Sequence, residues 1–164
     1  MIHYKSIDQS QFAEGTDIKE QERVFDDFLQ DSLLEIQGSH INKTNEANKK
    51  LHINGTQPDE EVPYIFLRTC NRSEIYYGEG EVPDEVARHL FRVVSGLESA
   101  IVGERAVQGQ VKEAYYTAKA QRPLTAELHR LFQSALQVGK RVRNETEISH
   151  GAVSHSLAAL EIIE

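Results

Sequence analysis

Three short stretches of the chain have the apolar pattern of β-strands, and one early stretch has the pattern of a helix. Residues 2–7 and 74–77 are rich in β-branched and aromatic side chains, and residues 64–68 form an apolar run typical of a buried strand. Residues 17–34 repeat apolar positions at helical spacing, with acidic side chains on the other face. We therefore expect a small, mostly antiparallel sheet with this helix on one face.

From residue 84 onward the apolar positions follow a helical period. One helix is predicted to start at Asp84, and a second runs from about Ala106 to the helix-breaking Pro123. Thr125 is suited to cap a third helix, of about 20 residues, and a fourth is predicted to begin near Val153. The fold class is therefore α/β (α+β), a sheet with packed helices followed by a helical half.

The segment of residues 37–62 is polar, with many Asn, Lys, Glu and Gly residues and few large apolar ones. The pair Asn54-Gly55 is a signal for a type I′ hairpin turn. The pattern therefore predicts either a hairpin or a mobile insertion at the surface. We find no candidate chemistry in this segment.

Charge is distributed unevenly within a formal net charge of −8. Residues 1–64 carry six Lys or Arg against 13 Asp or Glu, whereas residues 105–164 carry eight against six. Because nucleic-acid binders are usually basic, any such contact is expected to be local and in the second half. Lys140, Arg141 and Arg143 end one predicted helix there, where they either complement the helix dipole or bind phosphate.

The composition excludes several classes of protein. No apolar run approaches the length of about 20 residues that spans a bilayer, and the N-terminus has no apolar signal sequence. The single cysteine permits no internal disulfide and favours a reducing, cytoplasmic location. The sequence also shows no metal-ligand spacing and no dinucleotide-binding fingerprint.

The one cysteine, Cys70, follows the predicted strand of residues 64–68 and lies between polar neighbours. Thr69 and Asn71 offer hydrogen-bonding groups, and the guanidinium of Arg72 favours the nucleophilic thiolate form of the sulfur. A lone cysteine at a strand end is also commonly a small buried hydrophobic residue. His89, on the first predicted helix of the second half, is either a structural histidine or part of the chemistry.

Four separate blocks of sequence resemble one enzyme family. TCNRSEIY, HLFRVVSGLESAIVGE, GQVKEAY and LFQSALQVGKRVRNETEIS, the last followed by GAVS, are similar to the N-terminal catalytic domain of glutamyl-tRNA reductase. The blocks keep the order of the family over roughly residues 64–160, whereas the first 60 residues match poorly. The resemblance implies a ferredoxin-like subdomain in the sheet-containing half.

The resemblance also implies a reaction. In this family a cysteine, here Cys70, attacks the ester between glutamate and its tRNA, and NADPH reduces the resulting thioester to glutamate-1-semialdehyde. This is the first committed step of tetrapyrrole (porphyrin) biosynthesis by the five-carbon route. The partners implied are glutamyl-tRNA, a second subunit bound through a dimerisation domain, and an aminomutase.

The same resemblance implies the roles of individual residues. Arg72 would bind the side-chain carboxylate of glutamate, Glu104 would bind the α-ammonium group, and His89 would act beside Cys70 as a catalytic residue or protonate the leaving hydroxyl. The implied substrate-binding residues are Thr69, Asn71, Arg72, Ser99, Glu104, Arg105, Ala106 and Gln110.

The sequence departs from the family at two of these positions and near the N-terminus. The family usually has Pro-Gln where this chain has Arg105-Ala106, so contacts from these two side chains are in question. The family also carries a His-x-x-Ala-Pro segment after its first strand, where this chain has residues 7–10 without proline.

The resemblance divides the chain into a catalytic domain, residues 1–160, and the start of a linking helix, residues 149–164. The domain has a sheet-containing half, residues 1–80, and a helical half, residues 81–148. Because these residues contain neither the NADPH-binding nor the dimerisation domain, we expect thioester formation without reduction. Two other interpretations remain open: a non-enzymatic RNA- or protein-binding module, and a thiol hydrolase using Cys70 and His89.

Overall fold

The structure is a computed structural model that describes residues 1–51, 62–148 and 150, and the side chains of most of them. The elements follow one another as a strand, a short 3₁₀ helix and a long helix, then two strands and three helices. They are β1 (Ile2–Asp8), η1 (Gln9–Gln11), α1 (Ile18–Leu51), β2 (Tyr64–Arg68), β3 (Arg72–Gly78), α2 (Asp84–Val94), α3 (Ala106–Gln121) and α4 (Ala126–Glu145).

The three strands form one antiparallel sheet in the order β1-β3-β2, with β3 in the centre. Tyr76 of β3 pairs with Tyr4 on one side and with Ile65 on the other. Because directly paired residues share a face of the sheet, these three side chains point the same way. The prediction of a small antiparallel sheet with packed helices, followed by a helical half, is confirmed.

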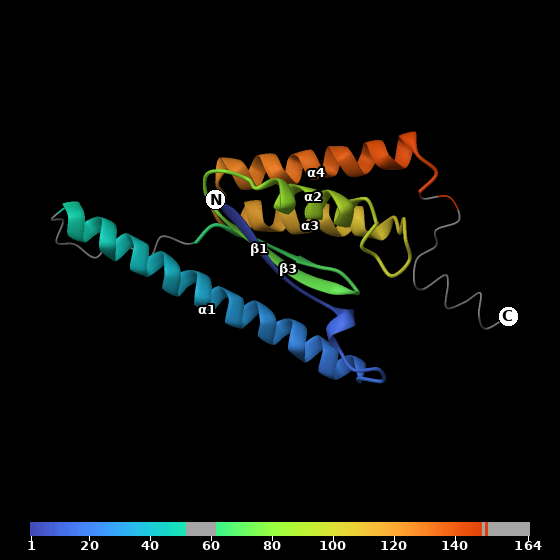
Figure 1. The fold of residues 1–164 in the computed structure, drawn as a ribbon, viewed down its shortest axis with the longest axis horizontal. Helices are drawn as coiled ribbons and strands as arrows, with labels where there is room; N and C mark the ends of the chain where they lie inside the picture. The colour runs from blue at the N-terminus through green and yellow to red at the C-terminus, as the bar shows by residue number, and fades with distance from the viewer. Residues whose placement is uncertain (52–61, 149, 151–164) are drawn as a thin grey trace.

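The two faces of the sheet are covered differently. Helix α1 lies along one face, and α2, α3 and α4 lie on the other (Figure 1). The main core is formed by the inner face of the sheet and these three helices. Within it, the ring of Tyr76 meets the ring of Phe132 edge-on, with centroids 5.1 Å apart. The sheet therefore supports a thick helical layer on one side and a single helix on the other.

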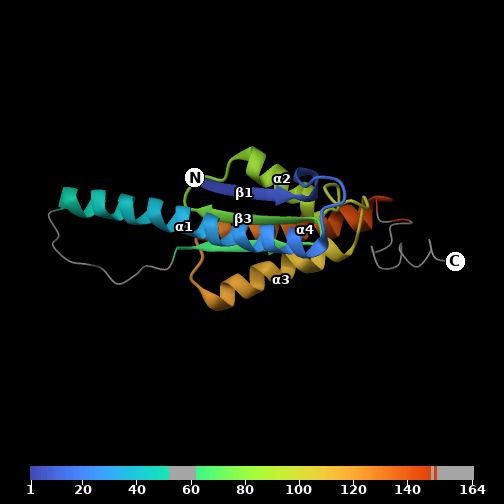
Figure 2. The same cartoon turned by 90° about the horizontal axis from the view of Figure 1, so that it is seen from below.

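Helix α1 is longer than its apolar pattern predicts. It spans 34 residues, so residues 37–51 continue the helix. The prediction of a hairpin or a mobile insertion is therefore wrong for these residues. The segment is polar, but no proline interrupts it before Leu51, and its Asn, Lys and Glu residues can continue a helix that has already begun. Figure 2 shows the C-terminal part of α1 extending beyond the sheet.

Two other expectations lie outside the described residues. The Asn54-Gly55 turn falls in the segment 52–61, and the helix near Val153 falls in the segment 151–164, which includes most of the proposed linking helix of residues 149–164.

The helices of the second half begin and end where the sequence predicts. Thr125 caps α4, because its hydroxyl accepts a hydrogen bond from the N–H of Leu128 at 3.4 Å. A close crossing joins α4 to α2 at Gly139, where an added Cβ would lie 2.9 Å from Cγ2 of Val94. This contact fixes the C-terminal part of α4 against the end of α2.

The direction of α3 relative to β2 matters for the site. Arg122, just after α3, places its guanidinium 3.8 Å from the ring centroid of Tyr64, at the start of β2. Its Nη1 also donates to the carbonyl of Tyr64 at 3.3 Å. The end of α3 therefore lies at the start of β2, so the two elements run antiparallel. The beginning of α3 lies toward the end of β2, where Cys70 follows.

Candidate active site

Cys70 lies at the surface, in the tight turn that joins β2 to β3. The N–H of Thr69 donates to the carbonyl of Arg72 at 2.9 Å, and the N–H of Asn71 donates to Oγ1 of Thr69 at 3.2 Å. Gln9 holds the turn from outside, since its Nε2 donates to the carbonyl of Cys70 at 3.0 Å. The alternative that Cys70 is a buried hydrophobic residue is wrong, because it is exposed in a hydrogen-bonded turn.

A buried ion-pair network lies beside this turn, on the inner face of the sheet. Glu74 is fully buried, and its Oε1 accepts hydrogen bonds from Nη1 of Arg72 at 2.9 Å and from Nε2 of His89 at 2.7 Å. Its other oxygen accepts the hydroxyl of Tyr76 at 2.6 Å. Arg72 also donates from Nη2 to the carbonyl of Glu98 at 2.7 Å. One carboxylate therefore holds three side chains, two from β3 and one from α2.

The network determines which protonation states are favoured. Burial alone would raise the pKa of Glu74, but hydrogen bonds from His89, Tyr76 and Arg72 outweigh it and lower that pKa. Burial and the charge of Glu74 raise the pKa of the Tyr76 hydroxyl well above its usual value. Glu74 is therefore the ionised acceptor and Tyr76 the neutral donor of this pair.

His89 is held on two sides. Besides its bond to Glu74, its ring stacks on the ring of Tyr4 with centroids 4.3 Å apart and an interplanar angle of 12°. The side chain of His89 is 18% exposed. This arrangement fixes the orientation of the imidazole from the sheet side and leaves its outer edge toward a shallow surface depression.

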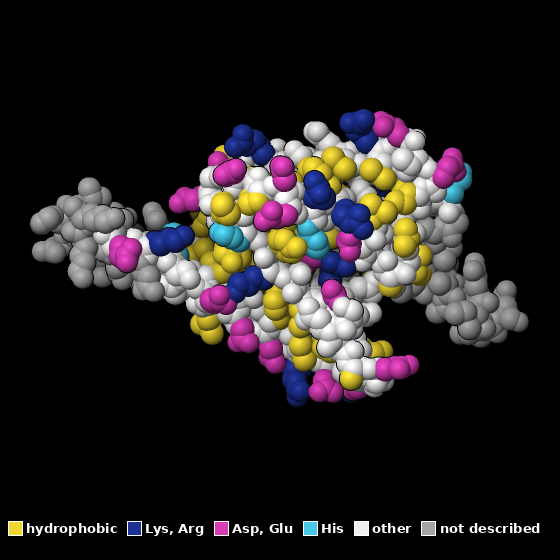
Figure 3. Space-filling model, in the orientation of Figure 1, with side chains coloured by type: hydrophobic (Ala, Val, Ile, Leu, Met, Phe, Trp, Pro, Cys, Tyr) yellow, Lys and Arg dark blue, Asp and Glu magenta, His cyan; other side chains and the backbone are white. Residues whose placement is uncertain are grey.

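The depression beside His89 has a volume of about 330 Å³ and is lined by side chains of α2 and the loop after it. Its lining combines both signs of charge: Asp84, Glu85, Arg88, His89, Arg92 and Glu98. On the face shown in Figure 3, acidic and basic side chains are interspersed and form no continuous basic patch. Any contact of this face with an anion would therefore be local.

The guanidinium of Arg72, which was expected to activate Cys70, is hydrogen-bonded to other groups. Both terminal nitrogens of Arg72 are hydrogen-bonded to Glu74 and to the carbonyl of Glu98. Partial burial and the negative charge of Glu104 raise the pKa of the Cys70 thiol, while a backbone hydrogen bond acts in the opposite direction. The prediction that Arg72 favours the thiolate is therefore wrong: in this structure the protonated thiol is favoured.

The loop between α2 and α3 brings Glu104 to the site. Gly96 and Gly103 both have positive φ, 81° and 79°, and the N–H of Gly103 donates to the carbonyl of Gly96 at 3.0 Å. A Cβ on Gly103 would lie 1.9 Å from the carbonyl oxygen of Ile148, so no larger residue fits there. The closed loop buries Glu104, which is 5% exposed, at the start of α3.

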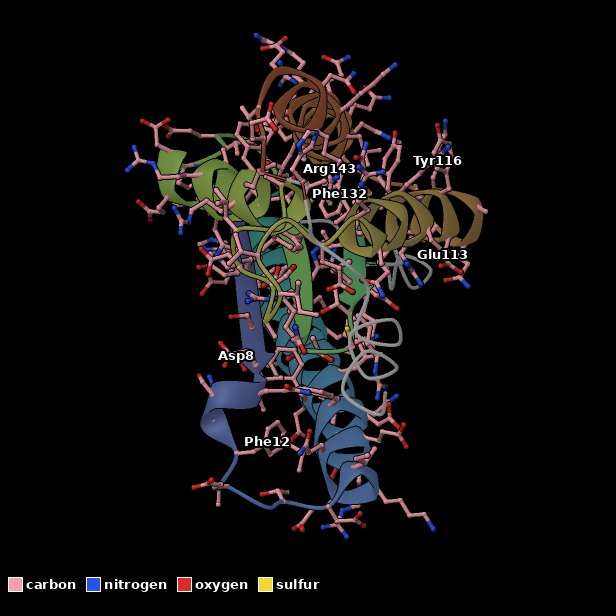
Figure 4. All side chains as sticks on the ribbon, turned by 90° about the vertical axis from the view of Figure 1, so that its right-hand side faces the viewer. Asp8, Phe12, Glu113, Tyr116, Phe132 and Arg143 are labelled. Carbon is pink, nitrogen blue, oxygen red and sulfur yellow. The ribbon has the colours of Figure 1, made fainter. Side chains whose placement is uncertain are left out.

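Arg143 fastens this loop to α4. Its Nη1 donates to the carbonyls of Val94 at 3.0 Å and Gly139 at 3.1 Å and to Oε1 of Gln108 at 2.7 Å. Its Nη2 donates to the carbonyl of Glu104 at 3.1 Å. Figure 4 shows Arg143 beneath α4, on the side toward Phe132. Arg143 is therefore a structural residue, and the alternative that it binds phosphate is not supported by its contacts.

The structure brings most of the predicted site residues to one end of the molecule. Thr69, Cys70, Asn71 and Arg72 form the turn, and Glu104 acts electrostatically on Cys70 across it. The others lie at different depths. Ser99 is half-buried in the loop, Arg105 and Ala106 are exposed at the start of α3, Gln110 is half-buried one turn further, and His89 belongs to the Glu74 network. Their contacts with substrate stay predictions.

The residue that the sequence analysis missed is Glu74. A signal was present, because Arg72, Glu74 and Tyr76 alternate along one strand and therefore share a face. A carboxylate between an arginine and an aromatic residue on the buried face of a strand requires partners. The strand was recognised, but the inward direction of these three side chains depended on the packing of α2 against the sheet.

Neither a metal nor a dinucleotide fits the described residues. Among residues 1–51, 62–148 and 150, no three His, Cys, Asp or Glu side chains form a group that could hold a metal ion. The sheet in the same residues is antiparallel, with no parallel strand leading through a glycine-rich turn into a helix, which is how dinucleotides are bound in Rossmann folds. No helix in the described part of the chain is long and apolar enough to cross a membrane.

Comparisons with known proteins agree with the motifs. The sequence profile of "Glutamyl-tRNAGlu reductase, N-terminal domain" matches residues 81–146. The glutamyl-tRNA reductase of Thermus thermophilus is 41% identical over 118 residues, which cover 60% of this chain and 30% of that protein. The enzyme of Methanopyrus kandleri is 42% identical over 117 residues, covering 61% of this chain and 29% of that protein.

The fold gives the same result. The solved structure of glutamyl-tRNA reductase from Methanopyrus kandleri matches with a TM-score of 0.54 and 36% sequence identity, covering 66% of this chain and 34% of that one. The chain spans about a third or less of the proteins it matches. In sequence and in fold, this chain is therefore similar to the N-terminal domain of glutamyl-tRNA reductase, as its motifs indicated.

Proposed function

We propose that this chain carries out the acyl-transfer half of the glutamyl-tRNA reductase reaction, with Cys70 as the nucleophile. The observation that supports it most is the exposed thiol in a turn fastened by hydrogen bonds on both sides. Catalysis through a covalent intermediate needs a nucleophile that substrate can reach and that is held in one place. The similarity to the reductases supplies the substrate, a glutamyl ester of tRNA.

The proposed step is an exchange of esters. The sulfur of Cys70 attacks the carbonyl carbon of the glutamyl ester, a C–S bond forms, and the bond to the ribose oxygen breaks. The products are a thioester on Cys70 and tRNA with a free terminal hydroxyl, which receives the proton lost by the thiol. An aminoacyl ester is already activated, so a thiolate of modest nucleophilicity is sufficient for this step.

The Glu74 network has a positioning role in this proposal. It fixes the guanidinium of Arg72, which uses two of its five N–H groups in bonds to Glu74 and Glu98. The remaining N–H groups are suited to the side-chain carboxylate of glutamate. Glu104, a buried acidic residue whose charge acts on the thiol, is suited to the α-ammonium group.

The rest of the proposal comes from the family resemblance alone. In the complete enzyme, NADPH would reduce the thioester to glutamate-1-semialdehyde, as a step of tetrapyrrole biosynthesis. That enzyme would be a dimer and would have an aminomutase as its partner. Because the described residues do not fit a dinucleotide, no step of the reduction is assigned to them.

Mass spectrometry of the chain after brief exposure to glutamyl-tRNA tests the proposal. We expect an adduct of one glutamyl unit that hydroxylamine removes and that is absent in Cys70→Ser. Circular dichroism of both proteins controls for folding. A folded protein with a free, alkylatable thiol and no adduct would reject acyl transfer and favour the binding-module interpretation. Turnover of simple esters without tRNA would favour the thiol-hydrolase interpretation instead.

A further inference from the structure

Arginine and histidine side chains commonly activate a cysteine, but the arginine and the histidine near Cys70 are both hydrogen-bonded to Glu74. Arg72 and His89 each donate a hydrogen bond to the same oxygen of Glu74, at 2.9 Å and 2.7 Å. A carboxylate buried between two donors holds them strongly, because separating the charges in a dry site is costly. The thiol of Cys70 therefore needs another group to accept its proton.

The architecture supplies a carboxylate at the right place. Helix α3 runs antiparallel to β2, since Arg122 at its end contacts Tyr64 at the start of that strand. The residues just before α3 therefore lie beside those just after β2. The closed loop between Gly96 and Gly103 and the bond from Arg143 to the carbonyl of Glu104 fix this arrangement.

We propose that Glu104 is the general base for Cys70, because α3 packs antiparallel on β2 and so brings this buried residue, just before α3, to the end of β2 that leads into the Cys70 turn. This inference rests on the proposed acyl transfer. Glu104 takes the proton of the Cys70 S–H group as the sulfur attacks the ester carbon. As the C–O bond breaks, the same carboxyl group returns the proton to the ribose oxygen of the tRNA. Atoms and charges balance without a further reactant.

The electrostatics of the pair agree with this geometry. The negative charge of Glu104 contributes to raising the pKa of the Cys70 thiol, so the proton stays on sulfur until substrate arrives. Two cations lie close to the backbone of Glu104. Arg143 bonds its carbonyl, and Arg105 lies near enough to Arg143 to contribute to lowering the pKa of that guanidinium, after burial. A thiol that reacts only when a base is aligned would protect the single cysteine from unrelated electrophiles.

A carboxylate has two oxygens, so Glu104 can also contact the α-ammonium group of glutamate as the family resemblance implies. The two roles make different predictions. Binding of the ammonium group matters only for an ester that carries this group. Proton transfer from Cys70 matters for any ester, including one whose amino group is acetylated.

The test compares Glu104→Gln, Glu104→Asp and the unchanged chain in single-turnover acylation by glutamyl-tRNA and by N-acetyl-glutamyl-tRNA. Loss of a general base typically lowers a rate by about 10²–10⁴-fold. We expect a decrease of that size in Glu104→Gln with both esters and partial recovery in Glu104→Asp. Glu113→Gln is the matched control, because Glu113 is exposed and points outward from α3 (Figure 4).

Alkylation of Cys70 by iodoacetamide over a range of pH shows whether the site is intact. Because Glu104 raises the thiol pKa, Glu104→Gln should be alkylated at least as fast as the unchanged chain near neutral pH. Faster alkylation together with slower acylation supports the general base. Acylation at the original rate, or a defect that disappears with the acetylated ester, overturns it. If the unchanged chain forms no adduct while its thiol is alkylated, the proposed acyl transfer itself fails.

Discussion

Two buried carboxylates near the Cys70 turn have opposite surroundings. Glu74 receives hydrogen bonds from Arg72, His89 and Tyr76 and is fully buried on the inner face of the sheet. Glu104 lies at the edge of the same site, where its charge disfavours the thiolate of Cys70. Glu74 therefore accepts three hydrogen bonds, whereas Glu104 raises the pKa of a neighbouring thiol.

The difference between Glu74 and Glu104 shows that the position of a glutamate in the fold decides its role. On the sheet, Glu74 is central in β3 and reached by groups from the same strand and from α2, so it acts as an anchor. In the loop, the position of Glu104 is set by the backbone, through two glycines with positive φ and a hydrogen bond from Arg143 to its carbonyl. We expect substitutions at the first to affect stability and substitutions at the second to affect chemistry.

The largest effect on stability is expected from Glu74→Gln. The change leaves the guanidinium of Arg72, which is 8% exposed, buried without its counter-charge. Breaking a buried pair in this way costs about 3–5 kcal/mol in the free energy of unfolding. Urea unfolding measures the loss, and Glu79→Gln, at an exposed residue, should stay within about 0.5 kcal/mol of the unchanged chain. Equal stabilities of the two variants would contradict the anchoring role.

A smaller effect is expected when the loop that places Glu104 is disturbed. Gly103→Ala puts a side chain at φ 79° and directs its Cβ onto the carbonyl of Ile148. The backbone conformation alone costs about 1–2 kcal/mol, and the contact adds to it. Gly109→Ala is the matched control, because an added Cβ would meet open space in the first turn of α3, and the substitution should stabilise the protein by about 0.5–1 kcal/mol.

Thermal or urea unfolding measures the stability of Gly103→Ala and Gly109→Ala, and formation of the glutamyl adduct measures the acylation rate of each. Gly103→Ala should also slow acylation, because Glu104 is the next residue. An unfolding free energy of Gly103→Ala as high as that of the unchanged chain would show that the loop tolerates a side chain at this position.

The smallest expected effect is on the pH dependence of stability. Hydrogen bonds lower the pKa of Glu74 in the folded protein, so the ionised form contributes stability that is complete above the unfolded pKa of about 4.3. This stability is lost as pH falls through the lower folded value, by about 1.4 kcal/mol per pH unit between the two. Urea unfolding between pH 7 and pH 3 should show a steeper decrease for the unchanged chain than for Glu74→Gln. Parallel curves would mean that the Glu74 carboxyl has the same pKa folded and unfolded.

Local patterns were sufficient for the elements that carry strong periodicity. The helices α2, α3 and α4 begin and end where Asp84, Ala106, Pro123 and Thr125 predicted, because caps and breakers act within a few residues. Helix α1 was underestimated, since a polar segment without breakers can be a loop or a helix, and polarity alone does not distinguish them.

The candidate site was only partly accessible to sequence reasoning. The turn residues adjoin one another in the chain, so Thr69, Cys70, Asn71 and Arg72 were found together. Glu104 was identified through the family resemblance, but its effect on the thiol pKa was not, because the two residues are far apart in the sequence. The effect of Arg72 on the thiol was mispredicted for a different reason: its partner Glu74 is only two residues away on β3, but it was taken only as a strand residue.

The sequence by itself determined the antiparallel sheet, the helical half, the identity of the single cysteine and the resemblance to the reductase domain. These features depend on residue type, spacing and order, which the chain carries locally. Only the tertiary structure decided which carboxylate holds Arg72 and His89 and which one raises the pKa of the Cys70 thiol. Those pairings depend on distances set by the packing of α2 and α3 on the sheet, and burial then makes each pairing strong enough to determine the chemistry of the turn.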